Sequence, residues 1–142
     1  MYGWVRLCLA GPNGLYYDHL DSLGNVSTRE WTYNQGAMIA AGVLLAGATG
    51  QRTYLDQAQA TAKAALARYG GSGYRGEPPI FVAIFFNDLS LLRQAAQLPS
   101  YRAALRNYLR RHVALRPDGH FGSSLVFQAA AVQLYSLAAA AG

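Results

Sequence analysis

Charged residues, lysine and cysteine are all scarce in this sequence. Asp, Glu, Lys and Arg together make up 13% of the 142 residues, against roughly 25% in a typical soluble domain. The hydrophobic content of 52% is nevertheless enough to bury a real core. This composition argues against a disordered chain. The low charge also indicates that part of the surface faces other protein instead of water.

The single cysteine, Cys8, excludes an internal disulfide, and its leucine neighbours favour burial of the thiol. Lys63 is the only lysine, so the net charge of +5 comes from arginines. These arginines are spread along the chain, which argues against nucleic acid as a partner. The densest group has the i, i+4 spacing of a solvated helix face: Arg102, Arg106, Arg110 and Arg111.

Several common functional motifs are also missing. The histidines at 19, 112 and 120 are well separated, so neither a metal site nor a cofactor is expected. There is no Gly-x-Ser-x-Gly elbow, and the glycine-rich run 70–73 lacks the rest of a phosphate loop, so it is interpreted as a connector. The start of the chain does not resemble a secretory signal. The apolar stretches are too short to predict a membrane span.

From Trp31 onward, alanine- and leucine-rich segments alternate with short clusters of Gly, Pro, Asp and Ser, which predicts an all-α fold. The expected helices are 33–49, 53–69, 79–97, 100–115 and 124–140. The first, third and fifth are apolar on nearly all sides, whereas the second and fourth carry a polar stripe. This order of inner and outer helices is typical of an α/α toroid or a helical solenoid.

The amino-terminal region has a different pattern. Residues 1–9 resemble the tail of a helix, and residues 11–30 form a polar, aromatic loop whose length favours a functional role. Aromatic rings beside Asp, Asn and Gln suit sugars, whose apolar ring faces are edged by hydroxyls. The candidate substrate-binding residues are Tyr17, Asp18, Asp21, Trp31, Tyr33, Asn34 and Gln35.

Two other interpretations of these residues remain. Asn34 and Gln35 are also suited to cap the next helix, while Trp31 packs against the loop. Asp18 and Asp21 resemble the paired carboxylates of glycosidases, but spacing on a loop does not fix their separation. An ordering or hydroxyl-binding role is preferred for both, and no catalytic residue is predicted.

The order of these motifs resembles glycoside hydrolase family 76, the α-1,6-mannanase-like enzymes. The matching segments are 2–5, 14–21, 31–36, 48–58, 81–85 and 128–134. The motif Trp31-Thr32-Tyr33-Asn34-Gln35-Gly36 is the most discriminating, because the pattern at 49–58 recurs in many α/α-barrel families. The resemblance implies that residues 1–142 are a single partial domain, the C-terminal half of an (α/α)6 barrel. It also implies α-mannan or another oligosaccharide as partner and an extracellular or cell-envelope location.

The sequence departs from the family at the positions that carry catalysis. The family uses two adjacent aspartates in its N-terminal half as nucleophile and acid/base, and no Asp-Asp pair occurs in this sequence. Val82 and Ala83 stand where the family has Lys and Gly, which is expected to remove a charge near the cleft.

The leading hypothesis is therefore an inactive fragment that supplies a sugar-binding cleft and self-associates through exposed inner helices. One alternative is a non-catalytic helical-repeat module that binds a glycan or a protein. A third, another α/α-barrel enzyme, fits the fold but not the motif at 31–36.

Overall fold

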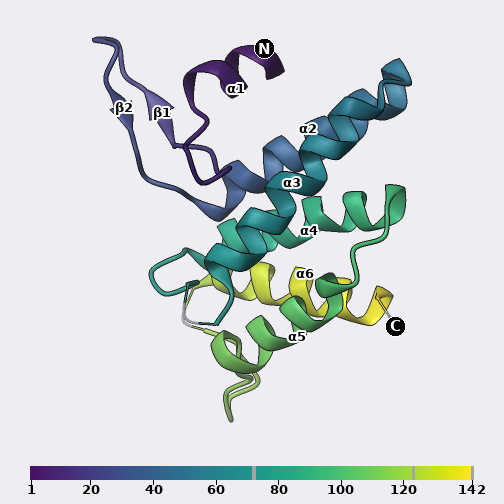
Figure 1. The fold of residues 1–142 in the computed structure, drawn as a ribbon. Helices are drawn as coiled ribbons and strands as arrows, with labels where there is room; N and C mark the ends of the chain where they lie inside the picture. The colour runs from purple at the N-terminus through teal and green to yellow at the C-terminus, as the bar shows by residue number, and fades with distance from the viewer. Residues whose placement is uncertain (72, 123, 142) are drawn as a thin grey trace.

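A computed structural model describes residues 1–71, 73–122 and 124–141. Within these ranges the chain forms six helices and one short antiparallel hairpin (Figure 1). The helices are α1 (Tyr2–Cys8), α2 (Thr32–Thr49), α3 (Arg52–Tyr69), α4 (Pro79–Ala95), α5 (Ser100–His112) and α6 (Leu125–Ala140). The hairpin strands β1 (His19–Leu20) and β2 (Val26–Ser27) pair His19 with Ser27 and Leu20 with Val26. Ser72, in the predicted connector, lies outside the described residues. No described helix is long and apolar enough to cross a membrane.

The five long helices form two layers. α2, α4 and α6 lie side by side with α4 in the middle, and they run in the same general direction (Figure 1). α3 packs on α2, and α5 packs on α6 and α4. The predicted alternation of inner and outer helices is therefore confirmed, and the fold is a partial α/α toroid.

Local sequence explains where these helices begin and end. α2 stops at Gly50, which adopts φ 71°, a conformation that residues with a side chain rarely take. α4 begins at Pro79, whose fixed φ suits a first helical turn and whose missing N–H has no partner to lose there. α6 begins after Ser124, whose hydroxyl oxygen accepts a hydrogen bond of 3.2 Å from the Phe127 N–H.

Three details differ from the sequence-based expectations. α4 and α5 end before residues 97 and 115, because Ala96 and Val113 adopt extended backbone conformations. The loop at 11–30 contains the hairpin, which its weak strand pattern does not predict. Cys8 is exposed instead of buried, because α1 has no buried residue.

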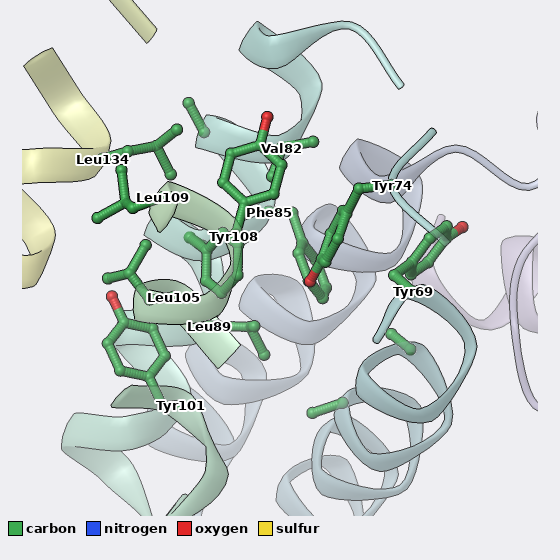
Figure 2. Close-up of a cluster of buried hydrophobic side chains, with 14 of the residues drawn as sticks. Tyr69, Tyr74, Val82, Phe85, Leu89, Tyr101, Leu105, Tyr108, Leu109 and Leu134 are labelled. Atoms are coloured by element: carbon green, nitrogen blue, oxygen red, sulfur yellow. The ribbon is translucent and has the colours of Figure 1, made fainter. Parts of the chain in front are cut away.

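The core lies between the two layers and is rich in aromatic rings (Figure 2). Phe86 of α4 packs against Tyr101 and Tyr108 of α5, with ring centroids 6.1 and 5.9 Å apart. Val82 is fully buried in the same core. The expected loss of a charge near the cleft stays a prediction, because the structure shows only that Val82 itself packs in the core.

Large apolar side chains remain exposed at two edges of the toroid. On α1, Leu7 is 88% exposed and Trp4 is about half exposed. On α6, Leu125 is 85% exposed, and Val126 and Val132 are also exposed. Large exposed apolar patches are typical of surfaces that contact another protein. α1 and α6 come at opposite ends of the helix order, as expected for the two open edges of an incomplete ring.

The long connections gather at one end of the inner layer. Residues 9–31, 70–78 and 113–124 lead into the N-termini of α2, α4 and α6, whereas the other connections are short. In Figure 1 the N-termini of α2, α4 and α6, which these connections reach, lie on the left side of the helices. Because long loops on a rigid scaffold usually carry function, this end is the place to look for a site.

Candidate functional site

Asp18 lies at the centre of a polar group at the start of α2. Its carboxylate accepts hydrogen bonds of 2.8 Å from the Tyr33 hydroxyl and 3.3 Å from the Asn34 side-chain amide. The His19 ring Nδ1 lies 2.9 Å from the other carboxylate oxygen. The loop before β1 and the first turn of α2 thus bring three predicted binding residues together.

The electrostatics of this group favour an ionised carboxylate. Burial by itself would raise the pKa of Asp18, but hydrogen bonds from His19, Tyr33 and Asn34 outweigh it and hold the pKa below its usual value. Burial and the Asp18 carboxylate raise the pKa of the Tyr33 phenol. At neutral pH, Asp18 is therefore an acceptor and Tyr33 a donor.

Aromatic rings extend the polar group across to the next inner helix. Trp31 and Tyr33 both pack on Phe81 at the start of α4, with ring centroids 5.3 and 4.5 Å apart. The Arg29 guanidinium lies 3.8 Å from the centre of the Trp31 ring, within range of a cation–π contact. We call Asp18, Trp31, Tyr33, Asn34 and Phe81 the Asp18 cluster. Sequence reasoning missed Phe81 as a site residue, although it stands in the matching segment 81–85.

Gln35 has a positioning role instead of a surface role. It is fully buried. Its carbonyl accepts a hydrogen bond of 2.8 Å from the Tyr16 N–H, and its amide donates to the carbonyls of Tyr16 and Trp31 at 2.8 and 3.0 Å. The prediction that Gln35 contacts a sugar is therefore corrected. The capping interpretation is corrected too, because no side chain at 34 or 35 caps the N-terminus of α2.

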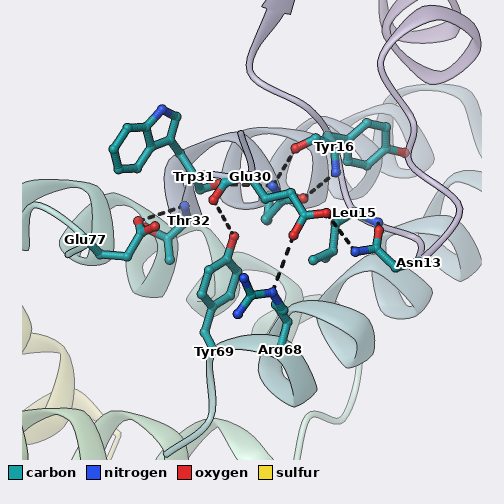
Figure 3. A network of polar contacts seen from close by, with 10 residues as sticks. Asn13, Leu15, Tyr16, Glu30, Trp31, Thr32, Arg68, Tyr69 and Glu77 are labelled. Carbon is teal, nitrogen blue, oxygen red and sulfur yellow. Dashed lines mark hydrogen bonds and ion pairs between the residues drawn. The ribbon is translucent and has the colours of Figure 1, made fainter. Parts of the chain in front are cut away.

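A second polar network holds the start of α2 from the outer side (Figure 3). The Glu77 carboxylate accepts hydrogen bonds from both the N–H and the hydroxyl of Thr32, at 3.0 and 2.7 Å. A carboxylate at a helix N-terminus is favourable, because the first N–H groups lack helical partners. Glu30 accepts a 2.7 Å bond from Asn13 and lies 3.5 Å from the Arg68 Nε. No local pattern marks Glu77, which is 45 residues from Thr32.

The remaining two predicted residues stand apart from the Asp18 cluster. Asp21 orders the hairpin turn, because its carboxylate accepts hydrogen bonds from the Leu23 and Asn25 N–H groups and from the Asn25 amide. The Asn25 bonds also lower the pKa of Asp21. The half-buried Tyr17 ring lies against Gly11. Within the described ranges, no side-chain hydrogen bond or ring contact joins Tyr17 or Asp21 to the Asp18 cluster.

The chemistry open to the site is binding through hydroxyl-directed hydrogen bonds and aromatic faces. No group of three His, Cys, Asp or Glu side chains in the described part of the chain is placed to hold a metal ion. Asp18 is engaged in ordering the cluster and Asp21 in ordering the turn.

Comparison with known proteins places this architecture in a family. The sequence model of Glycosyl hydrolase family 76 matches residues 1–113. The Lin0763 protein of Listeria innocua superposes with a TM-score of 0.84 at 23% identity, over 99% of this chain and 47% of that chain. An α-1,6-mannanase of Salegentibacter sp. superposes with a TM-score of 0.82 at 25% identity, over 99% of this chain and 50% of that chain.

An inactive variant of the Salegentibacter mannanase, with two adjacent aspartates replaced by alanine, was solved in complex with α-1,6-mannotetrose. It superposes with a TM-score of 0.83 at 24% identity, again over 99% of this chain and 50% of that chain. No curated protein matches the sequence directly. The chain thus spans about half the length of these solved relatives. Since the family model covers most of its residues, the chain belongs to glycosyl hydrolase family 76.

Proposed function

We propose that the loop end of this half toroid binds α-1,6-linked mannose chains as one side of a glycan cleft. The observation that carries the proposal is the Asp18 cluster, in which a carboxylate, a phenol, an amide and two further aromatic rings meet where the long connections gather. Sugar hydroxyls both donate and accept hydrogen bonds, so Asp18 and Asn34 suit them. The complex of the Salegentibacter variant with α-1,6-mannotetrose supports mannose as the sugar.

The chain is proposed to lack catalytic activity by itself. Retaining glycosidases place two carboxyl groups about 5–5.5 Å apart, and Asp18 and Asp21 are each engaged in structural hydrogen bonds. The Salegentibacter variant became inactive when two adjacent aspartates were replaced, and no adjacent aspartates occur in this sequence. Incubation with α-1,6-mannan should therefore release no reducing ends. Measurable release by pure protein would contradict this part of the proposal.

The exposed edges on α1 and α6 are proposed to be covered by a complementary helical half. The chain matches only 47–50% of the length of the relatives named above, and Leu125, Val126 and Val132 of α6 are left exposed by the described residues. Without that half, the same surfaces favour self-association. This part of the proposal concerns assembly and is independent of sugar binding.

Sugar binding is tested by titrating the dilute chain with α-1,6-mannotriose. The sequence contains two tryptophans, so Trp4→Phe leaves Trp31 as the only indole fluorophore. We expect a saturable change in Trp31 emission. Asp18→Asn replaces a charged acceptor oxygen with an NH2 donor, and Asn34→Ala removes an amide, so each should weaken binding about tenfold.

The matched controls separate recognition from nonspecific effects. Trp4→Phe should bind as the unaltered chain does, because Trp4 lies on α1. An α-1,4-linked glucose trisaccharide should not compete with mannotriose. Absence of saturable binding, or equal binding by Asp18→Asn, would refute the proposal.

A further inference from the structure

The three inner helices contain one acidic residue. α2 and α6 have no charged side chain, and α4 has only Asp88 and Arg93. The other six acidic residues of the chain lie in connections or on the outer helix α3. A single carboxylate in an otherwise apolar inner layer lowers the stability of the fold, so its position needs an explanation.

The geometry of α4 directs Asp88 toward the interior of the toroid. Phe86 points outward, since it packs on Tyr101 and Tyr108 of α5. Successive helical residues are about 100° apart, so Asp88 lies roughly 200° around the helix from Phe86. It shares its face with Ile84 and Phe81, at spacings of four and seven residues. Asp88 therefore lies on the interior face of α4, about 10 Å along the helix from Phe81 of the Asp18 cluster.

Gly36, the last residue of the motif at 31–36, makes room for this carboxylate. A Cβ atom added at Gly36 would lie 2.8 Å from the Asp88 Oδ2 and 3.0 Å from the Phe85 Cα. The absence of a side chain on α2 thus lets α4 approach closely and lets the carboxylate sit between the two inner helices. The motif that begins with Trp31 ends beside Asp88.

Asp88 has no compensating charge in the described part of the chain. None of the ion pairs found there involves Asp88, and only Asn87 donates a side-chain hydrogen bond that lowers its pKa. Burial raises the pKa of Asp88 to about 6. Perturbed, unpaired carboxyl groups of this kind concentrate at functional sites.

We propose that Asp88 is a substrate-binding residue whose carboxylate accepts hydrogen bonds from hydroxyl groups of a mannose unit lying deeper in the cleft than the Asp18 cluster. This inference rests on the proposed function and extends it to a second subsite. The hydroxyl groups of the sugar donate the hydrogen bonds to Asp88 that the described part of the chain does not provide. Phe81 and Ile84 lie on the same face of α4 as Asp88.

The test compares Asp88→Asn with the unaltered chain by calorimetric titration with α-1,6-mannotetrose. Asparagine keeps the shape and removes the charge, so binding should weaken about tenfold or more at neutral pH. Asp56→Asn, which makes the same charge change on the outer helix α3, should bind normally. Equal affinity of Asp88→Asn and the unaltered chain would overturn this inference.

The pH dependence supplies a second readout. Affinity should fall as the pH is lowered through about 6, because a protonated Asp88 loses acceptor capacity. The fall should disappear in Asp88→Asn and persist in His19→Gln, which removes the imidazole beside Asp18. If the affinity of Asp88→Asn still falls as the pH is lowered, the inference about Asp88 is contradicted, but the proposed function is not. Failure of the unaltered chain to bind mannotetrose at any pH refutes the proposed function as well.

Discussion

Removing the charge of Asp88 should stabilise the folded chain. Burial raises the pKa of its carboxyl from 3.8 to about 6, a difference that corresponds to about 3 kcal/mol. Because Asp88 is only partly buried, solvent screening should reduce this free-energy difference to about 1–2 kcal/mol. Asp88→Asn is therefore expected to raise the free energy of unfolding by about 1–2 kcal/mol at neutral pH.

The sign of the pH dependence follows from linkage. The pKa of Asp88 is higher in the folded chain than in the unfolded chain, so between pH 3.8 and about 6 the folded chain binds more protons. The stability that Asp88 contributes is thus greatest at low pH and is lost as the pH rises to about 6. Asp18 and Asp21 have lowered pKa values, so their contributions are lost in acid, below the usual carboxyl range.

Urea unfolding followed by circular dichroism measures the difference. Subtracting the unaltered chain from Asp88→Asn at each pH cancels the other titrating groups, and the remaining difference should shrink as the pH falls below about 6 and almost vanish below about pH 3. Each measurement is made at two protein concentrations, because self-association changes apparent stability. Asp56→Asn controls for a loss of surface charge. If Asp88→Asn is no more stable than the unaltered chain at neutral pH, the carboxylate is compensated and the reasoning about the inner layer fails.

Three further variants test the scaffold of the site. Gln35→Ala removes two buried hydrogen bonds and a partly buried one and should lower the free energy of unfolding by about 2–4 kcal/mol; a loss of mannotriose binding with unchanged urea stability would contradict its positioning role. Gly36→Ala should cost about 1–3 kcal/mol in the same assay, because the added methyl meets the α4 backbone; an unchanged midpoint would show that the inner helices adjust freely. Val132→Glu, on the exposed edge of α6, should shift sedimentation toward monomer, and identical profiles would mean that this edge is not the contact surface.

Much of the helical architecture was predictable because inner and outer helices differ in composition. α2 and α6 contain no charged residue, whereas α3 carries Asp56 and Lys63 on its polar side. That contrast reflects burial directly. The ends of α4 and α5 were less predictable, because Ala96 and Val113 carry no helix-stopping signal of their own.

The sequence predicted the residues of the Asp18 cluster better than the residues that position them. Asp18, Tyr33 and Asn34 stand out because polar and aromatic residues alternate in a loop and its following turn. Glu77 and Asp88 act through contacts between segments far apart in the chain, which no local pattern reveals. Gln35 was misassigned because an amide on a binding surface and an amide buried against the backbone look alike in a sequence.

The contacts that shape the Asp18 cluster all lie within this half of the toroid. Gln35 fixes the loop to α2 at 2.8 Å, and Glu77 fixes the start of α2 at 2.7 and 3.0 Å. Each of these bonds joins segments that are present in the chain, so the binding face should form without a complementary half. In the proposed closure of the ring, the contact surfaces are instead the exposed apolar side chains of α1 and α6. Binding and assembly are therefore expected to respond to different substitutions: Val132→Glu should alter association and leave mannotriose affinity unchanged, whereas Asp18→Asn should do the reverse.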